Sequence, residues 1–278
     1  MSADNLADLT VVTGGSSGIG RCLVQNFLET GDVLNIARRP ATGGGRSAQH
    51  RLYDLTFDLS STEDIAPALD GWFRGHPGYA VSTLIHNAAT TDLGRLSEVS
   101  PATISHAFAV NFYAPLTITN ALLARGRFSR QGAAVAYIVS SLARFLPELS
   151  FSGIGLYSIT KAALSRMALI QSREFRLAGQ NIRILRIHPG IVDTNLQRGL
   201  RRAPDIDPRF AGKTAGLPPY QPGEWRDKKP RDNMRTISSQ LAAEFIHWVI
   251  TAGVASDAEF DFYECDEFHD ARYGRGLS

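Results

Sequence analysis

The chain has 278 residues, of which 44% are hydrophobic, and a formal net charge of +2 at neutral pH. This length suffices for one large domain or two small ones with a full apolar core. The small net charge gives no general electrostatic attraction to nucleic acid or to a membrane surface. The composition therefore argues against a protein that binds either of them through its overall charge.

The cysteines and the chain start carry little functional signal. Cys22 and Cys265 lie far apart without metal or disulfide spacing, so we expect two reduced thiols and no metal site. The first residues lack a basic region followed by an apolar core, and no run of about 18 apolar residues occurs. We therefore expect a cytoplasmic protein without a membrane span.

Strand and helix patterns alternate along the chain. The predicted strands are short apolar runs at 9–13, 33–37, 52–57, 81–86, 134–140, 182–188 and 258–263. The predicted helices, with apolar residues at helical spacing, are 18–30, 62–74, 101–126, 157–178 and 236–252. This alternation predicts an α/β fold: a doubly wound parallel sheet in a single Rossmann-type domain.

The connection between the first strand and the first helix is rich in glycine. Gly14 permits a tight turn, Gly18 allows close approach of a pyrophosphate, and Gly20 lets helix and strand pack closely. The amides of the helix N-terminus would face the negative charge. An ordinary glycine turn is the alternative, but the position favours a dinucleotide site at Gly14, Ser16, Ser17, Gly18, Ile19 and Gly20.

Two further connections suit a dinucleotide. Arg38 and Arg39 follow the second strand, where an acidic residue would accept from ribose hydroxyls, and a guanidinium there matches a 2′-phosphate. This favours NADP(H) over NAD, against the alternative of a solvated basic turn. Asn87, Ala88 and Ala89 follow the fourth strand, and their small side chains leave room for a flat ring.

Tyr157 and Lys161 stand four residues apart at the start of a predicted helix and share one face. An ammonium beside a phenol favours the phenolate, so we expect the pKa of Tyr157 to fall from its reference of about 10 toward neutrality. Such a pair suits acid–base chemistry, although surface pairs at this spacing are common. Together with the glycine loop, it predicts an enzyme that moves a hydride to or from a nicotinamide.

Three polar residues stand at suggestive positions. Ser140 and Ser141 end an apolar strand, where a hydroxyl can donate to a substrate carbonyl, or where a serine pair simply forms a turn. Asn111 interrupts a long apolar helix pattern. Its amide is either a satisfied core group or the site of a kink that holds a water in a proton path.

Residues 198–235 break the alternation, with six prolines and ten Lys or Arg against five Asp or Glu. A connection of this length predicts a substrate lid or a disordered segment. Residues 257–270 hold seven acidic residues and no Lys or Arg. This tail is either a solvated acidic end or a partner for the basic segment.

Together these residues resemble the classical short-chain dehydrogenase/reductase family over about residues 9–265. The glycine pattern TGxxxGxG stands at 13–20, and the active-site residues of the family match Asn111, Ser141, Tyr157 and Lys161. The resemblance implies an adenine contact at Asp58 and Leu59. It also implies contacts beside the nicotinamide at Pro189, Gly190, Val192 and Thr194.

Residues 188–197 and 260–263 are similar to the sepiapterin reductase and benzil reductase branch. In that branch the residue that matches Asp261 anchors the pterin. The alternative for Asp261 is an ion pair with lid arginines such as Arg198, Arg201 or Arg202. Ser141 lies sixteen residues before Tyr157, farther than the family usually has it, which indicates an insertion within 145–155 that reshapes the substrate wall.

The resemblance implies an NADPH-dependent oxidoreductase that reduces a ketone or aldehyde, with a pterin or an aromatic diketone favoured. Tyr157 would give the proton, Lys161 would hold the ribose, Ser141 would polarise the carbonyl and Asn111 would support proton resupply. The expected substrate contacts are Ser141, Leu142, Leu149, Phe151 and Asp261.

We expect a homodimer or homotetramer through the helices 101–126 and 157–178. The main alternative is a redox-sensing regulator that binds NADP(H) with little turnover. A protein that binds nucleic acid through the basic segment is a weaker alternative, because Tyr220 and Trp225 fit no known recognition pattern there.

Overall fold

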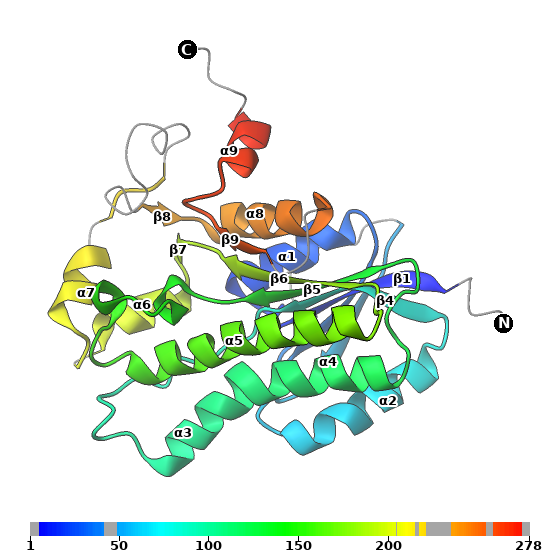
Figure 1. Ribbon diagram of the computed structural model, residues 1–278, viewed down its shortest axis with the longest axis horizontal. Coiled ribbons are helices and arrows are strands. Elements are labelled where there is room, and N and C mark those ends of the chain that lie inside the picture. The colour runs from blue at the N-terminus through cyan, green and yellow to red at the C-terminus, as the bar shows by residue number, and fades with distance from the viewer. Residues whose placement is uncertain are drawn as a thin grey trace.

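A parallel sheet of seven strands forms the centre of the computed structural model, which describes residues 6–41, 49–203, 205–214, 217–220, 235–253 and 258–273 (Figure 1). The strands lie in the order β3-β2-β1-β4-β5-β6-β9, and all neighbours pair in parallel. Their bounds are Ala7–Thr13 (β1), Asp32–Ala37 (β2), Leu52–Thr56 (β3), Tyr79–His86 (β4), Ala133–Ile138 (β5), Ile182–His188 (β6) and Glu259–Asp261 (β9). All seven predicted strands are therefore present, and the order reverses between β1 and β4, where ligands bind in doubly wound sheets.

Helices cover both faces of the sheet. Their bounds are Gly18–Leu28 (α1), Ile65–Gly75 (α2), Pro101–Phe108 (α3), Ala114–Ala124 (α4), Gly155–Leu177 (α5), Asn195–Arg202 (α6), Pro208–Thr214 (α7), Ser239–Thr251 (α8) and Asp266–Tyr273 (α9). The hydroxyls of Ser100, Thr194 and Ser238 cap α3, α6 and α8 by accepting from backbone N–H groups. The two short strands Ile191–Val192 (β7) and Thr236–Ile237 (β8) pair outside the main sheet.

The predicted single helix over 101–126 is interrupted. A π-helical turn, Ala109–Tyr113, separates α3 from α4 and holds the buried Asn111 at its middle. A π turn inserts an extra residue into the helical ladder, and such turns are frequent at functional sites. The periodicity predicted the length of this helical run, and the irregular turn lies at Asn111, where a kink was one of the two alternatives that the sequence offered.

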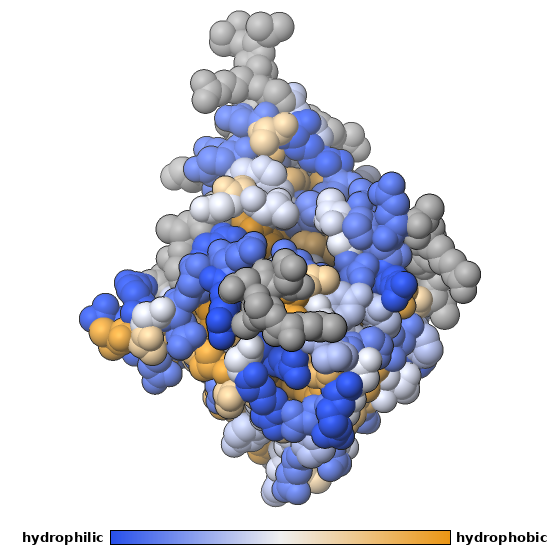
Figure 2. All heavy atoms as spheres, turned by 90° about the vertical axis from the view of Figure 1, so that its right-hand side faces the viewer, coloured by the Kyte–Doolittle hydropathy of each residue, from blue (hydrophilic) through white to orange (hydrophobic). Residues whose placement is uncertain are grey.

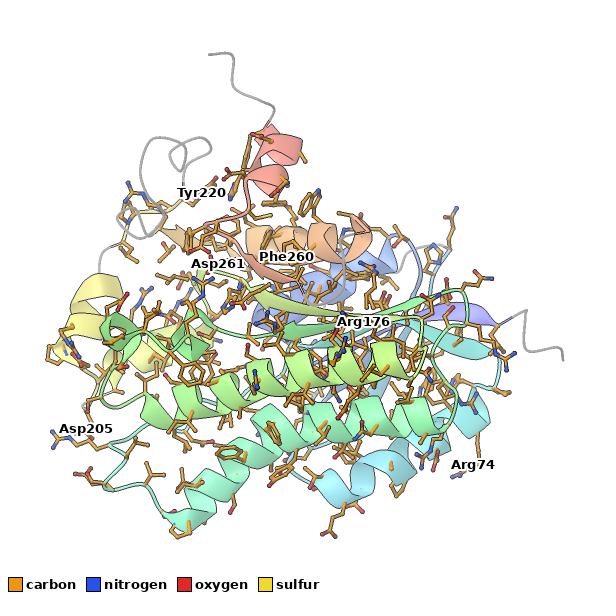
Figure 3. The ribbon with its side chains drawn as sticks, viewed as in Figure 1. Arg74, Arg176, Asp205, Tyr220, Phe260 and Asp261 are labelled. Carbon is orange, nitrogen blue, oxygen red and sulfur yellow. The ribbon has the colours of Figure 1, made fainter. Side chains whose placement is uncertain are left out.

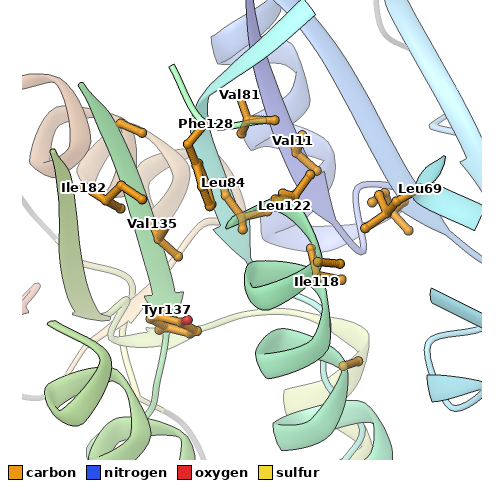
Figure 4. Packing of buried hydrophobic residues seen from close by; sticks show 14 of the residues in the cluster. Val11, Leu69, Val81, Leu84, Ile118, Leu122, Phe128, Val135, Tyr137 and Ile182 are labelled. Atoms are coloured by element: carbon orange, nitrogen blue, oxygen red, sulfur yellow. The ribbon is translucent and has the colours of Figure 1, made fainter. Parts of the chain in front are cut away.

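Alternating side chains of the strands feed two apolar cores. Val11, Leu84 and Val135 pack against Leu122 of α4 and Leu69 of α2 on one face (Figure 4). The neighbouring residues Val12, Ile85 and Ala136 belong to the core on the other face, which α1 and α8 cover. Burial on both faces fits the near-continuous apolar strands that the sequence shows.

A third apolar cluster lies beyond the ends of β5 and β6, where α6 and α7 stand in Figure 1. Leu200 of α6 and Phe210 of α7 pack with Phe151 and Ile154. The first part of the basic segment 198–235 is thus helical, because its apolar residues have a core to join. Residues 204, 215–216 and 221–234 of that segment lie outside the described part of the chain.

Hydrophilic side chains cover most of the face shown in Figure 2, with apolar residues in small separate patches. The helical run Pro101–Ala124 is long and apolar enough to cross a membrane by length and composition, a test that core helices of soluble proteins also pass. It is partly buried in the fold. Cys22 and Cys265 are free, and both are buried.

Candidate active site

One cavity of about 430 Å³ opens where the carboxyl ends of the strands meet. Its lining comes from the segments that follow β1, β2, β3, β4, β5 and β6, and from β9. It contains every residue that the sequence predicted to contact cofactor or substrate. Of the four predicted catalytic residues, Ser141, Tyr157 and Lys161 line it, whereas Asn111 does not belong to the lining.

The glycine loop begins the cavity and requires its glycines. Gly14 and Gly18 have φ values of +73° and +54°, which side chains rarely adopt. A Cβ at Gly14 would lie 3.0 Å from the Cα of Ala88, and one at Gly20 would overlap the carbonyl of Gly14. The small side chain of Ala88 therefore lets the end of β4 approach the loop closely.

Asn87 and Thr13 join the ends of β4 and β1. The amide nitrogen of the Asn87 side chain donates to the carbonyl of Thr13 at 3.0 Å. The Thr13 hydroxyl in turn accepts from the backbone N–H groups of Asn87 and Ala88, both at 3.1 Å. These bonds hold the floor of the cavity in one conformation beside the glycine loop.

The second strand delivers an exposed basic pair to the cavity rim. Arg38 and Arg39 are exposed and line the cavity next to Asp58 and Leu59. Asp58 accepts from the backbone N–H of Ser60 at 3.0 Å, and this bond, with help from the charge of Arg38, lowers the pKa of its carboxyl. Two exposed guanidinium groups beside a glycine-rich loop form a donor set suited to phosphate.

Tyr157 and Lys161 lie at the middle of the cavity, on the first turns of α5. The ammonium of Lys161 is buried, donates to the carbonyl of Ile138 at 2.8 Å, and lies 5.8 Å from the centre of the Tyr157 ring. Burial lowers the pKa of Lys161 to about 8. Burial also raises the pKa of Tyr157 to about 12, partly offset by a hydrogen bond from Ser140.

The prediction of a lowered Tyr157 pKa is therefore wrong for this structure. Removal of the phenol from water disfavours the phenolate, and the Lys161 ammonium is engaged by a carbonyl rather than by the phenol. The helical spacing correctly placed the two side chains on one face, but it carried no information about burial.

The serine that interacts with the phenol is Ser140, whereas the sequence assigned Ser141 to the substrate carbonyl, a role that stays a prediction. The Ser140 hydroxyl interacts with Tyr157 and also accepts from the backbone N–H of Leu142 at 3.3 Å. Ser141 begins a short 3-10 turn, Ser141–Ala143, and lines the cavity beside it. The serine pair was visible in the sequence, but the choice between its members depends on how the turn folds.

Asn111 lies behind the cavity with its amide fully used. Its side-chain oxygen accepts from the N–H of Thr90 at 2.8 Å, and its nitrogen donates to the carbonyl of Thr90 at 2.9 Å and to the hydroxyl of Thr160 at 3.0 Å. Thr160 in turn donates to the carbonyl of Tyr157 at 2.9 Å. The π turn thus ties the segment after β4 to the helix that carries Tyr157.

Asp261 lines the cavity from β9 (Figure 3), a strand at the edge of the sheet far from β2, which carries the basic pair at its end. Its side chain is 7% exposed, and it lies 3.3 Å from a guanidinium nitrogen of Arg144. Burial raises the pKa of its carboxyl. The hydrogen bond that this carboxyl accepts from the backbone N–H of Tyr263 at 2.9 Å acts in the opposite direction. The predicted ion pair with Arg198, Arg201 or Arg202 is wrong for Arg198, which pairs with Asp193 at 3.0 Å.

Arg144 forms ion pairs with three carboxylates of the acidic tail. It contacts Glu264 at 3.2 Å and Glu259 at 3.6 Å as well as Asp261. Glu259 also accepts from His188 at 2.6 Å, a bond that lowers its pKa to about 2. In the described residues, these tail carboxylates therefore pair with Arg144 and the end of β6 instead of the basic segment, because Arg144 sits directly beside β9.

An apolar wall completes the cavity. The predicted residues Leu142, Leu149 and Phe151 line it. The lining residues that the sequence did not assign include His188, Leu196, Leu200, Phe210 and Tyr263. His188 stands directly before the Pro189-Gly190 motif and could have been found there, whereas the others depend on how α6, α7 and the tail fold back.

Comparison with known proteins agrees with this architecture. A family model described as short chain dehydrogenase matches residues 8–205. The sorbitol dehydrogenase of Cereibacter sphaeroides is 29% identical over 212 residues, which are 72% of this chain and 74% of that protein.

Solved structures match over most of the chain at 18% identity. A short chain dehydrogenase from Burkholderia cenocepacia in complex with NADP has a TM-score of 0.67, with 94% of this chain and 97% of that chain covered. A 4-hydroxyisoleucine dehydrogenase complexed with NADH has a TM-score of 0.66, with 92% and 96% covered.

Proposed function

Because the chain belongs to the short-chain dehydrogenase/reductase family, we propose that it is an NADPH-dependent oxidoreductase that reduces a ketone or aldehyde. The observation that carries the proposal is a single cavity that joins the glycine loop and Arg38 at one end to Tyr157 and Lys161 at its middle. Dinucleotide and carbonyl substrate would meet beside the phenol.

The lining fits NADP(H). The loop at Gly14 and Gly18 has the open backbone that a pyrophosphate needs, and Arg38 and Arg39 supply guanidinium groups for a 2′-phosphate. Asp58, Leu59, Asn87, Ala88 and Ala89 would contact the adenine and the rings, and Pro189, Gly190, Val192 and Thr194 would lie beside the carboxamide. The bound nicotinamide supplies the hydride.

The chain's own groups would handle the proton. A phenol with a pKa near 12 is protonated at neutral pH, so Tyr157 acts as the acid that donates to the carbonyl oxygen. Ser140 and Ser141 would orient that oxygen, and Lys161 would hold the ribose and stabilise the phenolate left behind. Asn111 would hold, through Thr160, the helix turn that carries Tyr157; its part in proton resupply is what the family resemblance implies.

The pH profile of carbonyl reduction should report Lys161. Its pKa of about 8 means that the ammonium is present below pH 8 and is lost above it. We expect kcat/KM with NADPH, measured from pH 5 to 10, to fall on the alkaline side with a midpoint near that value. Lys161→Arg should remove this limb, because a guanidinium stays charged. An alkaline limb of the same midpoint in Lys161→Arg would contradict the assignment.

The substrate would be bulky and amphipathic. Leu142, Leu149 and Phe151 offer an apolar wall, and Asp261 offers a carboxylate at the far end. A carboxylate can accept paired donors from an amino-pyrimidine ring, which supports a sepiapterin-like pterin. An aromatic diketone fits the apolar wall alone. The similarity to the sepiapterin and benzil reductase branch supports this pair of candidates.

Asp261→Asn separates the two candidates, because it keeps the shape and removes the charge. If Asp261 anchors a pterin, the KM for sepiapterin should rise by about tenfold or more, the worth of a hydrogen bond to a charged group, while an apolar diketone is unaffected. Asp8→Asn, at an exposed site at the start of β1 and outside the cavity lining, is the matched control. Equal losses with both substrates would show that Asp261 serves the Arg144 ion pair instead.

The remaining proposals concern the rest of the chain. We infer a single NADP-binding domain over 1–278 with a substrate lid at 198–235, supported by the packing of Leu200 and Phe210 against the substrate wall. A homodimer or homotetramer is supported by the exposed apolar side chains of Ile104, Ile159 and Ile170 on α3 and α5. The expected compartment is the cytoplasm.

An NADPH-consumption screen tests the proposed function. Sepiapterin, aromatic diketones and simple quinones are offered with NADPH, and the loss of absorbance at 340 nm is followed. We expect turnover of at least one carbonyl class that saturates with substrate. Tight NADPH binding without turnover of any compound would favour the redox-sensing regulator.

A further inference from the structure

A polar side chain stands where the second strand should be purely apolar. Asn35 lies in the middle of β2, is 1% exposed, and is flanked by the core residues Leu34 and Ile36. Its side-chain oxygen accepts from the backbone N–H of Gly15 at 2.8 Å. Its side-chain nitrogen donates to a carboxylate oxygen of Asp54 on β3 at 2.7 Å. A buried amide with both ends satisfied holds one orientation.

This bond directs the glycine loop. Gly14 and Ser16 line the cavity, whereas the N–H of Gly15 between them points back to the sheet and is satisfied by Asn35. A Cβ at Gly15 would lie 2.6 Å from the Asn35 oxygen, so the glycine is needed for the approach. Asn35 therefore sets the orientation of the peptide that leads into the cradle.

The same carboxylate oxygen also bonds the end of the turn that carries the basic pair. Asp54 Oδ1 accepts from the backbone N–H of Ala41 at 2.9 Å, in addition to Asn35. Ala41 is buried and ends the exposed turn that carries Arg38 and Arg39. The turn is thus fixed at its start by β2 and at its end by Asp54.

We propose that Asp54 is a positioning residue for cofactor selection. Through Asn35 it holds the glycine loop in place for the pyrophosphate of NADPH, and through Ala41 it holds the Arg38–Arg39 turn in place for the 2′-phosphate. This inference rests on the proposed NADPH dependence. Asp54 touches no phosphate itself. It acts by keeping the two guanidinium groups where a 2′-phosphate can meet them, and NADH has no group there.

Binding measurements test this role without catalysis. Kd values for NADPH and NADH are measured by titration of protein fluorescence for wild type, Asp54→Ala and Asp54→Asn, with Tm followed in parallel. Asparagine keeps an acceptor oxygen for Ala41 and Asn35, whereas alanine removes it, and both variants lose the same charge. Their difference therefore isolates the hydrogen bonds.

We expect Asp54→Ala to lower the preference for NADPH over NADH by about tenfold, within the range of a lost hydrogen bond to a charged group. Asp54→Asn should keep the wild-type preference, and Asn35→Ala should weaken both cofactors, because both use the glycine loop. If wild type prefers NADPH and Asp54→Ala leaves that preference unchanged, the inference is wrong while the proposed function stands. A wild type that prefers NADH overturns both.

Discussion

Replacing Tyr157 with phenylalanine should lower the turnover number by about a thousandfold, within the range for removal of a positioned acid, and leave the Kd for NADPH nearly unchanged. In the proposed function the phenol that lines the cavity is the protonated acid, and its ring packs in the apolar cluster with Phe151 and Leu200. Phenylalanine preserves that packing and removes only the hydroxyl.

The comparison is made by steady-state kinetics with the best carbonyl from the screen and by NADPH titration. Tyr113→Phe is the control, because Tyr113 is 51% exposed on the π turn and should change neither quantity. Turnover at the wild-type rate in Tyr157→Phe would exclude the phenol as the proton donor.

Arg38→Ala should weaken NADPH binding by ~1–3 kcal/mol, the range for a hydrogen bond to a charged group, and affect NADH little. This corresponds to a rise in Kd of roughly five- to 150-fold. Arg38 is exposed and lines the cavity, and in the proposed binding mode it meets the 2′-phosphate, a group that NADPH has and NADH lacks. Because the interaction is electrostatic, raising the salt concentration should reduce the difference between wild type and variant.

Arg74→Ala provides the matched loss of one charge, since Arg74 is exposed on α2 (Figure 3) and does not line the cavity. It should leave both cofactors unaffected. Equal losses of NADPH and NADH affinity in Arg38→Ala would mean that Arg38 supports the loop and does not contact the 2′-phosphate.

Much of the fold followed from local signals. The central strands β1, β4 and β5 are rich in apolar residues, and the glycine positions follow from backbone conformation alone, as the positive φ of Gly14 illustrates. The register of the Tyr157–Lys161 pair followed from helical geometry. These features depend on a few neighbouring residues, so the sequence could predict them.

The features that the sequence could not predict depend on contacts between segments that are distant along the chain. Asp261 meets Arg144 across 117 residues of sequence, and neither residue signals the other. The Tyr157 pKa depends on how much water reaches the phenol, which the helical spacing cannot show. Likewise, the sequence around Asn35 does not show that its side chain bonds Gly15 and Asp54, which lie on neighbouring segments of the fold.

The transfer of deuterium tests the central claim most directly. NADPH carrying deuterium at both C4 positions of the nicotinamide is incubated with the protein and a carbonyl substrate, and the alcohol is analysed by mass spectrometry. The account predicts one deuterium on the new carbinol carbon for each NADPH consumed, and none above background with Tyr157→Phe. NADPH that binds but delivers no deuterium to any carbonyl of the screen would contradict it.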